Sequence, residues 1–88
     1  MTSEYEPATL KDLAAFFEKL APEDADYQHN HEYDDNGHSH MRASLLGASV
    51  SVPIRDGELT LGQWQQLVLI DFDNTARTRE VRVQIVGE

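Results

Sequence analysis

The chain has 88 residues, enough for one small domain, because single hydrophobic cores usually form within about 50–200 residues. Sixteen acidic residues against seven basic ones give a formal net charge of −9, which disfavours general binding to nucleic-acid phosphates. The absence of cysteine excludes disulfides, thiolate metal sites and a cysteine nucleophile. The longest apolar run, Leu67–Ile70, is far shorter than the roughly 20 residues of a membrane span. We therefore expect one domain over residues 1–88, with no membrane or nucleic-acid partner and, since no secretory signal follows Met1, a cytoplasmic location.

An amphipathic helix is predicted near the N-terminus. Apolar side chains recur at the spacing of one helix face, at Leu10, Leu13, Ala14, Phe17 and Leu20. Thr9 is the candidate N-cap, and Ala21-Pro22 marks the end because proline cannot continue the helical hydrogen-bond ladder.

A polar stretch follows this helix. From Glu23 to His40 the chain has almost no aliphatic side chain, and it holds all four histidines. Asp35-Asn36-Gly37 is typical of a tight turn, because Asn-Gly readily adopts positive φ angles. We expect a long polar loop here, and such loops in small proteins are usually functional or disordered.

The apolar period then changes to two, which indicates β-strands. Ala48–Ile54 alternates apolar and polar side chains and predicts a half-buried strand with Pro53 at its edge or end. Asp56-Gly57 is expected to turn the chain, and Leu59 and Leu61 begin the return.

Two further strands are expected in the second half of the chain. Trp64–Phe72 is apolar on both faces and predicts a central strand, and Val81–Ile85 alternates as a last amphipathic strand. The expected fold is therefore α+β, an antiparallel, β-sandwich-like sheet with one amphipathic helix. One short helix cannot cover such a sheet, so we expect other subunits or a further segment to complete it.

The histidines are the main chemical signal. They form two i, i+2 pairs, His29 with His31 and His38 with His40. On an extended strand such positions point to the same side, roughly 6.5–7 Å apart, so their imidazoles can converge on a divalent transition metal, with zinc as first choice. Nearby acids can complete or orient the metal shell: Glu32, Asp34, Asp35 and Asp71. The alternative is a solvated polar loop whose histidines are close by chance.

Other side chains are candidates for substrate contact, each with a structural alternative. Trp64 and Gln65 can line a pocket, or the tryptophan can anchor the sheet. Asn36 and Ser39 can hold a phosphate or sugar hydroxyl of a small phosphorylated molecule, or serve as turn formers. Asp71 is a candidate acid or base, or a residue at an exposed strand end. No catalytic residue is assigned.

Several separate sequence blocks occur in a fixed order. They are Y-x-H-N at Tyr27–Asn30, N-x-x-S-H at Asn36–His40, ASLLG-x-S-x-x-x-P at Ala43–Pro53, G-x-L-x-LG-x-WQ at Gly57–Gln65, Asp71-Phe72-Asp73, and Gly87-Glu88. Together these blocks resemble the YjbQ-like family, also called the secondary thiamine-phosphate synthase family.

The departures from the family pattern bear on the domain organisation. Family members carry additional N-terminal strands with a His-Thr-Thr-type motif, so the resemblance implies that this chain corresponds to the C-terminal portion of the family fold. Where the family tends to have Glu-Phe-Asp-Gly-Pro-Arg, this chain has the sequence of Asp71–Ala76. A shortened relative, a fragment and one half of a divided protein all fit this pattern.

The resemblance also carries expectations about function. It implies a metal site with His40 at the strongest motif position, His29 next and His38 at a variable position, and assembly as a homo-oligomer, most simply a trimer. It further implies a thiamine-phosphate synthase-like transfer that joins a pyrimidine pyrophosphate to a thiazole phosphate. The alternative is a non-catalytic relative that binds metal or forms an oligomer.

Overall fold

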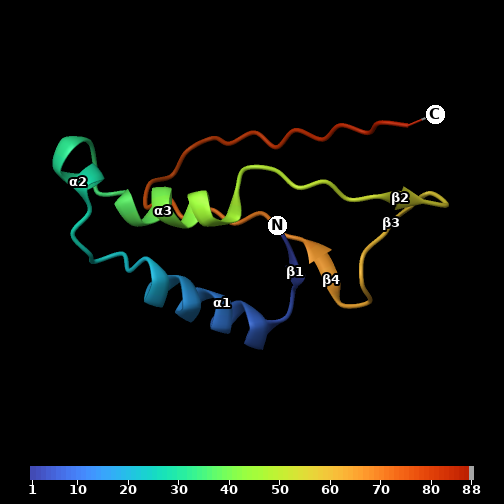
Figure 1. The fold of residues 1–88 in the computed structure, drawn as a ribbon, viewed down its shortest axis with the longest axis horizontal. Helices are drawn as coiled ribbons and strands as arrows, with labels where there is room; N and C mark the ends of the chain where they lie inside the picture. Colours follow the sequence, from blue (N-terminus) through green and yellow to red (C-terminus); the bar gives the residue numbers. More distant parts are fainter. Residues whose placement is uncertain (88) are drawn as a thin grey trace.

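The structure is a computed structural model that describes residues 1–87, so Glu88 of the expected domain lies outside the described residues. The elements follow in the order β1 Thr2–Glu4, α1 Pro7–Leu20, α2 Gln28–Glu32, α3 Gly37–Leu46, β2 Ile54–Arg55, β3 Glu58–Leu59 and β4 Gln65–Leu67 (Figure 1). Strand β1 pairs antiparallel with β4, and β2 pairs antiparallel with β3. The predicted α+β class with antiparallel pairing is confirmed.

Helix α1 is the predicted amphipathic helix, but the expected N-cap at Thr9 is wrong. The cap is Glu6, whose carboxylate accepts hydrogen bonds from the side chain and backbone of Thr9, and these bonds lower the pKa of Glu6. Pro7 fits the first helical position because the N–H that proline lacks has no helical acceptor there. The helix ends as predicted, with the Ala21 N–H donating to the Phe17 carbonyl at 2.8 Å.

A small core forms where α1 meets α3 and the chain after β4. Phe17 is buried and packs edge-to-face on Phe72, with ring centroids 4.9 Å apart. The Arg42 guanidinium of α3 lies 5.7 Å from the Phe72 ring centroid, donates to the Ala21 carbonyl at 2.9 Å and pairs with Glu18 at 2.7 Å. This packing fixes α3, and with it the N-terminal turn that carries two histidines.

The polar stretch is not one long loop, because it contains α2 and the start of α3. Asn36 has φ −108°, so the Asn-Gly pair does not form the expected tight turn. Gly37 instead begins α3 at a very close approach, where an added Cβ would lie 2.5 Å from Tyr27 Cβ and 2.6 Å from Asn30 Oδ1. The glycine is therefore required by the contact between α2 and α3.

The predicted β-hairpin is confirmed, but it is short. Ile54 pairs with Leu59 and Arg55 with Glu58 across a turn in which Asp56 and Gly57 have φ angles of 53° and 79°. The remainder of the predicted strand from Ala48 is irregular. Positive φ at both turn positions is typical of the two-residue turns that join antiparallel strands.

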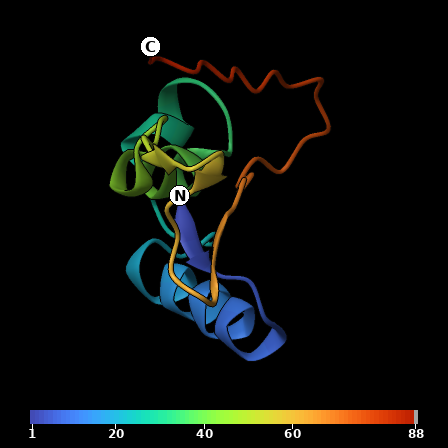
Figure 2. The same ribbon diagram turned by 90° about the vertical axis from the view of Figure 1, so that its right-hand side faces the viewer.

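The predicted central and last strands are corrected more strongly. Only Gln65–Leu67 of the expected strand Trp64–Phe72 joins a ladder, and Val81–Ile85 has no strand partner within residues 1–87. Figures 1 and 2 show this C-terminal segment running apart from the helices. Alternating apolar residues indicate a segment with one face suited to burial, but a strand also needs a neighbouring strand with which to form hydrogen bonds. The described chain thus has three helices and two separate two-stranded ladders in place of one helix on a sandwich-like sheet.

The exposed apolar surface is concentrated along the chain after α3. An open groove of about 590 Å³ is lined by residues 46–50, 67–70 and 81–85 together with nearby apolar side chains. Val83 and Ile85 are 82% and 75% exposed. No helix within the described residues has the length and hydropathy needed to cross a membrane.

Candidate metal centre

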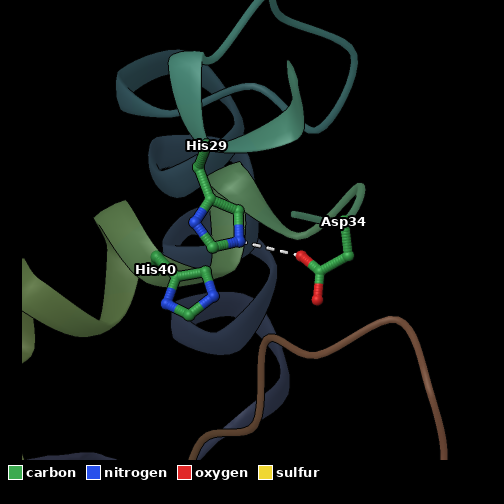
Figure 3. A group of neighbouring side chains, drawn as sticks. All are labelled: His29, Asp34 and His40. Carbon is green, nitrogen blue, oxygen red and sulfur yellow. Dashed lines mark hydrogen bonds and ion pairs between the residues drawn. The ribbon is translucent and has the colours of Figure 1, made fainter. Parts of the chain in front are cut away.

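Three side chains from α2, α3 and their connection converge at one end of the molecule. Each of His29, Asp34 and His40 offers one ligand atom, and these atoms all lie within 4.8 Å of one another. His29 Nε2 lies 2.8 Å from Asp34 Oδ1, and the rings of His29 and His40 are tilted by 45° with centroids 4.1 Å apart (Figure 3). The structure thus places His29 and His40, the two histidines with the strongest positions in the family resemblance, close to the carboxylate of Asp34.

The local sequence explains why α2 folds back on α3. The Gly37 N–H donates to Asn30 Oδ1 at 2.8 Å, which ties the first residue of α3 to the middle of α2. The Tyr27 hydroxyl donates to the Pro22 carbonyl at 2.6 Å and anchors the start of α2. With a glycine at the contact point, the two short helices approach closely enough for His29 to reach the first turn of α3.

The carboxylate of the cluster is held in its charged form. The hydrogen bond with His29 is the main cause of the lowered pKa of Asp34, and the N–H of Asn36 also donates to this carboxylate, at 3.2 Å. The side chains of His29 and Asp34 are 26% and 51% exposed, so the cluster opens to solvent on one side. An ionised oxygen ligand therefore faces two imidazoles at an accessible site.

This donor set fits a divalent transition metal. Zinc is bound by imidazole nitrogens and carboxylate oxygens at about 2.0–2.2 Å, and tetrahedral geometry then places ligand atoms roughly 3.3–3.5 Å apart. The three ligand atoms lie within 4.8 Å of one another, so adjustments of an ångström or so reach that geometry. Three protein ligands leave a fourth position free for water or substrate, as in catalytic zinc sites.

The other two histidines do not join this cluster. His31 lies two residues after His29 on α2 and pairs with Asp26, at 2.6 Å. His38, predicted as a third ligand, is 2% exposed, and its Nδ1 has no hydrogen-bond partner among the described residues. The expectation that each pair points to one side is wrong because the residues are helical, and helical neighbours at i, i+2 diverge by about 200°.

The proposed substrate contacts are scattered. Ser39 is half-buried on α3 next to His40, whereas Asp71 pairs with Arg79 at 2.6 Å. Trp64 is 70% exposed, so it does not anchor a sheet.

The Trp64-Gln65 segment lies away from the histidines. Gln65 donates to the Thr2 hydroxyl at 2.9 Å, and Trp64 and Gln65 line a separate hollow beside β1 and β4. Figure 1 shows β4 near the N-terminal end of α1, whereas α2 lies beyond its other end. These two residues therefore cannot share a small ligand with the metal cluster in this arrangement.

Sequence reasoning missed the part played by Asp73. Its carboxylate accepts a hydrogen bond from Asn36 Nδ2 at 2.9 Å, so the predicted phosphate-binding side chain of Asn36 is already engaged and is only 5% exposed. Only the acidic-Phe-Asp block at residues 71–73 pointed to this region. Asp73 lies 37 residues after Asn36, so no local sequence pattern could predict the contact between them.

Comparison with known proteins identifies the family. All of residues 1–88 match the model described as UPF0047 protein YjbQ-like. A UPF0047 protein of Archaeoglobus fulgidus is 43% identical over 82 residues, which cover 93% of this chain and 64% of that protein. A UPF0047 protein of Methanothermobacter thermautotrophicus is 40% identical over 86 residues, which cover 98% and 59% of the two chains.

A solved structure shares the fold. The crystal structure of a YbjQ-like protein of unknown function from Sulfolobus solfataricus P2 matches with a TM-score of 0.70 and 32% identity, over 74% of this chain and 46% of that one. The present chain spans about three-fifths of the length of the curated relatives it matches. On the match over its full length and on these identities, the chain belongs to the UPF0047 YjbQ-like family.

Proposed function

We propose that this protein binds a divalent transition metal ion, with zinc as the first choice, through His29, Asp34 and His40. The observation that carries the proposal is the convergence of two imidazoles and one carboxylate from three different segments of the chain. The lowered pKa of Asp34 supports it, since metal ligands must be deprotonated. The side chains of His29 and Asp34 are partly exposed, so a metal ion can reach the cluster from solvent.

The reaction we propose is a thiamine-phosphate synthase-like transfer onto a thiazole phosphate. This reaction is proposed from the family resemblance. Because the chain spans about three-fifths of the length of its relatives, we propose the reaction for a site that the remaining part of such a protein would complete. A bound metal would supply positive charge against the departing pyrophosphate. Of this chain's own residues, His29, Asp34 and His40 would hold the metal, and Ser39, which precedes His40 on α3, is the predicted phosphate contact adjacent to the cluster in sequence.

The second candidate is a non-catalytic relative that binds metal or assembles into an oligomer. Its support is the open apolar groove together with the exposed side chains of Val83 and Ile85. Exposed apolar patches of this kind often mark protein–protein interfaces. We propose a homo-oligomer, with the trimer suggested by the family resemblance as the first form to test.

Zinc titration by calorimetry tests the metal proposal. We expect stoichiometric uptake by the wild type, loss of uptake in His40→Ala and Asp34→Asn, and strong weakening in His29→Ala. His31→Ala is the matched control, because this histidine lies on the same helix as His29 but pairs with Asp26 outside the cluster. Equal uptake by the wild type and His40→Ala would contradict the proposed site. Formation of thiamine phosphate by the zinc-loaded but not the metal-free protein separates the enzyme from the non-catalytic alternative.

A further inference from the structure

The loop of residues 71–79 is organised around one carboxylate. Asp73 Oδ1 accepts hydrogen bonds from the backbone N–H and hydroxyl of Thr75, at 2.9 and 2.8 Å. Asp73 Oδ2 pairs with Arg77 at 2.8 Å and with Arg79 at 2.9 Å. The bonds from Thr75 are the main cause of the lowered pKa of Asp73, which falls to about 2. The loop therefore has a defined conformation built on an ionised side chain.

Asn36 joins this loop to the start of α3 by a reciprocal pair of hydrogen bonds. Its Nδ2 donates to Asp73 Oδ1 at 2.9 Å, and its Oδ1 accepts from the Asn74 N–H at 3.2 Å. The Asn74 side chain adds a third bond, to the Asp35 carbonyl, at 3.2 Å. We call this arrangement the Asn36 clasp. Its partners are 37 and 38 residues away in sequence, so it is a tertiary contact.

The backbone of the same asparagine contacts two of the three candidate metal ligands. Its N–H donates to Asp34 Oδ1 at 3.2 Å, the oxygen that also faces His29 Nε2 at 2.8 Å. Its carbonyl accepts from the His40 N–H at 3.1 Å. A shift of Asn36 would therefore move both Asp34 and the first turn of α3 that carries His40.

We propose that Asn36 is a positioning residue, which couples the position of the 71–79 loop to the orientation of Asp34 and His40. The inference rests on the proposed metal site and replaces the expectation that Asn36 touches substrate. The Asn36 side chain is buried, and its amide already donates one hydrogen bond and accepts another, so it has little capacity to bind a ligand. Residues that orient metal ligands typically change metal affinity about 10–100-fold when substituted.

The test uses two substitutions that remove the amide of Asn36. Asn36→Asp places a second carboxylate against Asp73, so like charges face each other across the Asn36 clasp. Asn36→Ser removes the amide without adding a charge. We expect the zinc Kd to rise about tenfold in both variants, because both lose the hydrogen bond from Asn36 Nδ2 to Asp73. Glu80→Gln, which removes one carboxylate charge at an exposed side chain that pairs with Arg82 just beyond the loop, is expected to leave the Kd unchanged.

A second readout needs no metal. Trypsin cleaves after arginine, so the rate of cleavage at Arg77 and Arg79 in the metal-free protein reports how firmly the loop is held. We expect faster cleavage in Asn36→Asp and in Asn36→Ser than in the wild type. If Asn36→Asp does not fold, Asn36→Ser gives the same comparison against the wild type, because it removes the amide without adding charge.

The outcomes separate the two proposals. Zinc binding by the wild type with an unchanged Kd in Asn36→Asp, despite faster trypsin cleavage, overturns the coupling and leaves the metal site standing. Failure of the wild type to bind zinc overturns the proposed function and the coupling to metal together. In that case the trypsin cleavage rates are the remaining test of the Asn36 clasp. Equal cleavage rates in the wild type and all variants would refute it.

Discussion

Replacing Gly37 with alanine probes the contact that brings α2 onto α3. The added Cβ would lie 2.5 Å from Tyr27 Cβ and 2.6 Å from Asn30 Oδ1, closer than such atoms are found in proteins. Tyr27 Cβ is attached directly to the backbone, so relief requires α2 itself to move. Overpacking of this kind costs about 1–3 kcal/mol. Gly37 is the first residue of α3, so the gain of alanine over glycine in a helix interior does not offset this cost. We expect a destabilisation of about 1–3 kcal/mol.

The substitution should also weaken zinc binding, because movement of α2 carries His29 away from His40. The free energy of unfolding is measured by urea denaturation, and zinc affinity by titration of the same samples. Gly62→Ala is the matched control, since a Cβ there meets nothing closer than 3.6 Å. A Gly37→Ala protein with wild-type stability and wild-type zinc affinity would show that the close approach of α2 and α3 does not organise the site.

The charged groups and the exposed apolar surface set how the protein responds to pH and whether it self-associates. The pKa of Asp73 in the folded protein is lowered from 3.8 to about 2, so this group stabilises the fold above pH 3.8 and loses that effect as the pH falls to about 2. The free energy of unfolding, measured by urea denaturation across this pH range, should therefore decline less in Asp73→Asn than in the wild type. Equal declines would contradict the lowered pKa of Asp73. Zinc uptake should be weaker at acidic than at neutral pH, because metal displaces protons from its ligands; calorimetry at several pH values checks this, and pH-independent uptake would argue against imidazole and carboxylate ligands. In sedimentation, the wild type should form an oligomer, a trimer first, and Val83→Lys should shift it toward monomer; a well-folded wild-type monomer would refute self-association through the groove.

The sequence predicted the first helix and the hairpin turn, whereas the regular apolar alternation of Val81–Ile85 did not suffice for a strand without a partner among the described residues. Helix α1 was recognised because its apolar side chains repeat on one face, and the Asp56-Gly57 hairpin because its turn demands positive φ. Helix α2 was missed because Gln28–Glu32 contains no apolar side chain to reveal its period, and α3 was missed because its first four residues, Gly37–His40, were assigned to the polar loop. Gly37 looked like a turn former, whereas its function is a close contact that exists only in three dimensions.

The candidate site was predicted in part for the same reason. The family resemblance pointed to His29 and His40, and the structure brings them together with Asp34, one of the acids expected to complete the shell. His38 was added on the assumption of an extended backbone, and the helical turn of α3 directs it elsewhere. The Asn36 clasp joins residues far apart in sequence, which no local pattern could indicate.

Zinc K-edge X-ray absorption on the zinc-loaded protein shows how many imidazoles bind the metal. We expect two histidine nitrogens at about 2.0–2.1 Å together with oxygen ligands in the wild type, and a single histidine in His40→Ala if that variant retains any zinc. The same two-histidine signal should persist in His31→Ala. A zinc shell made only of oxygen, or one that keeps both histidines in His40→Ala, would contradict the metal centre formed by His29, Asp34 and His40.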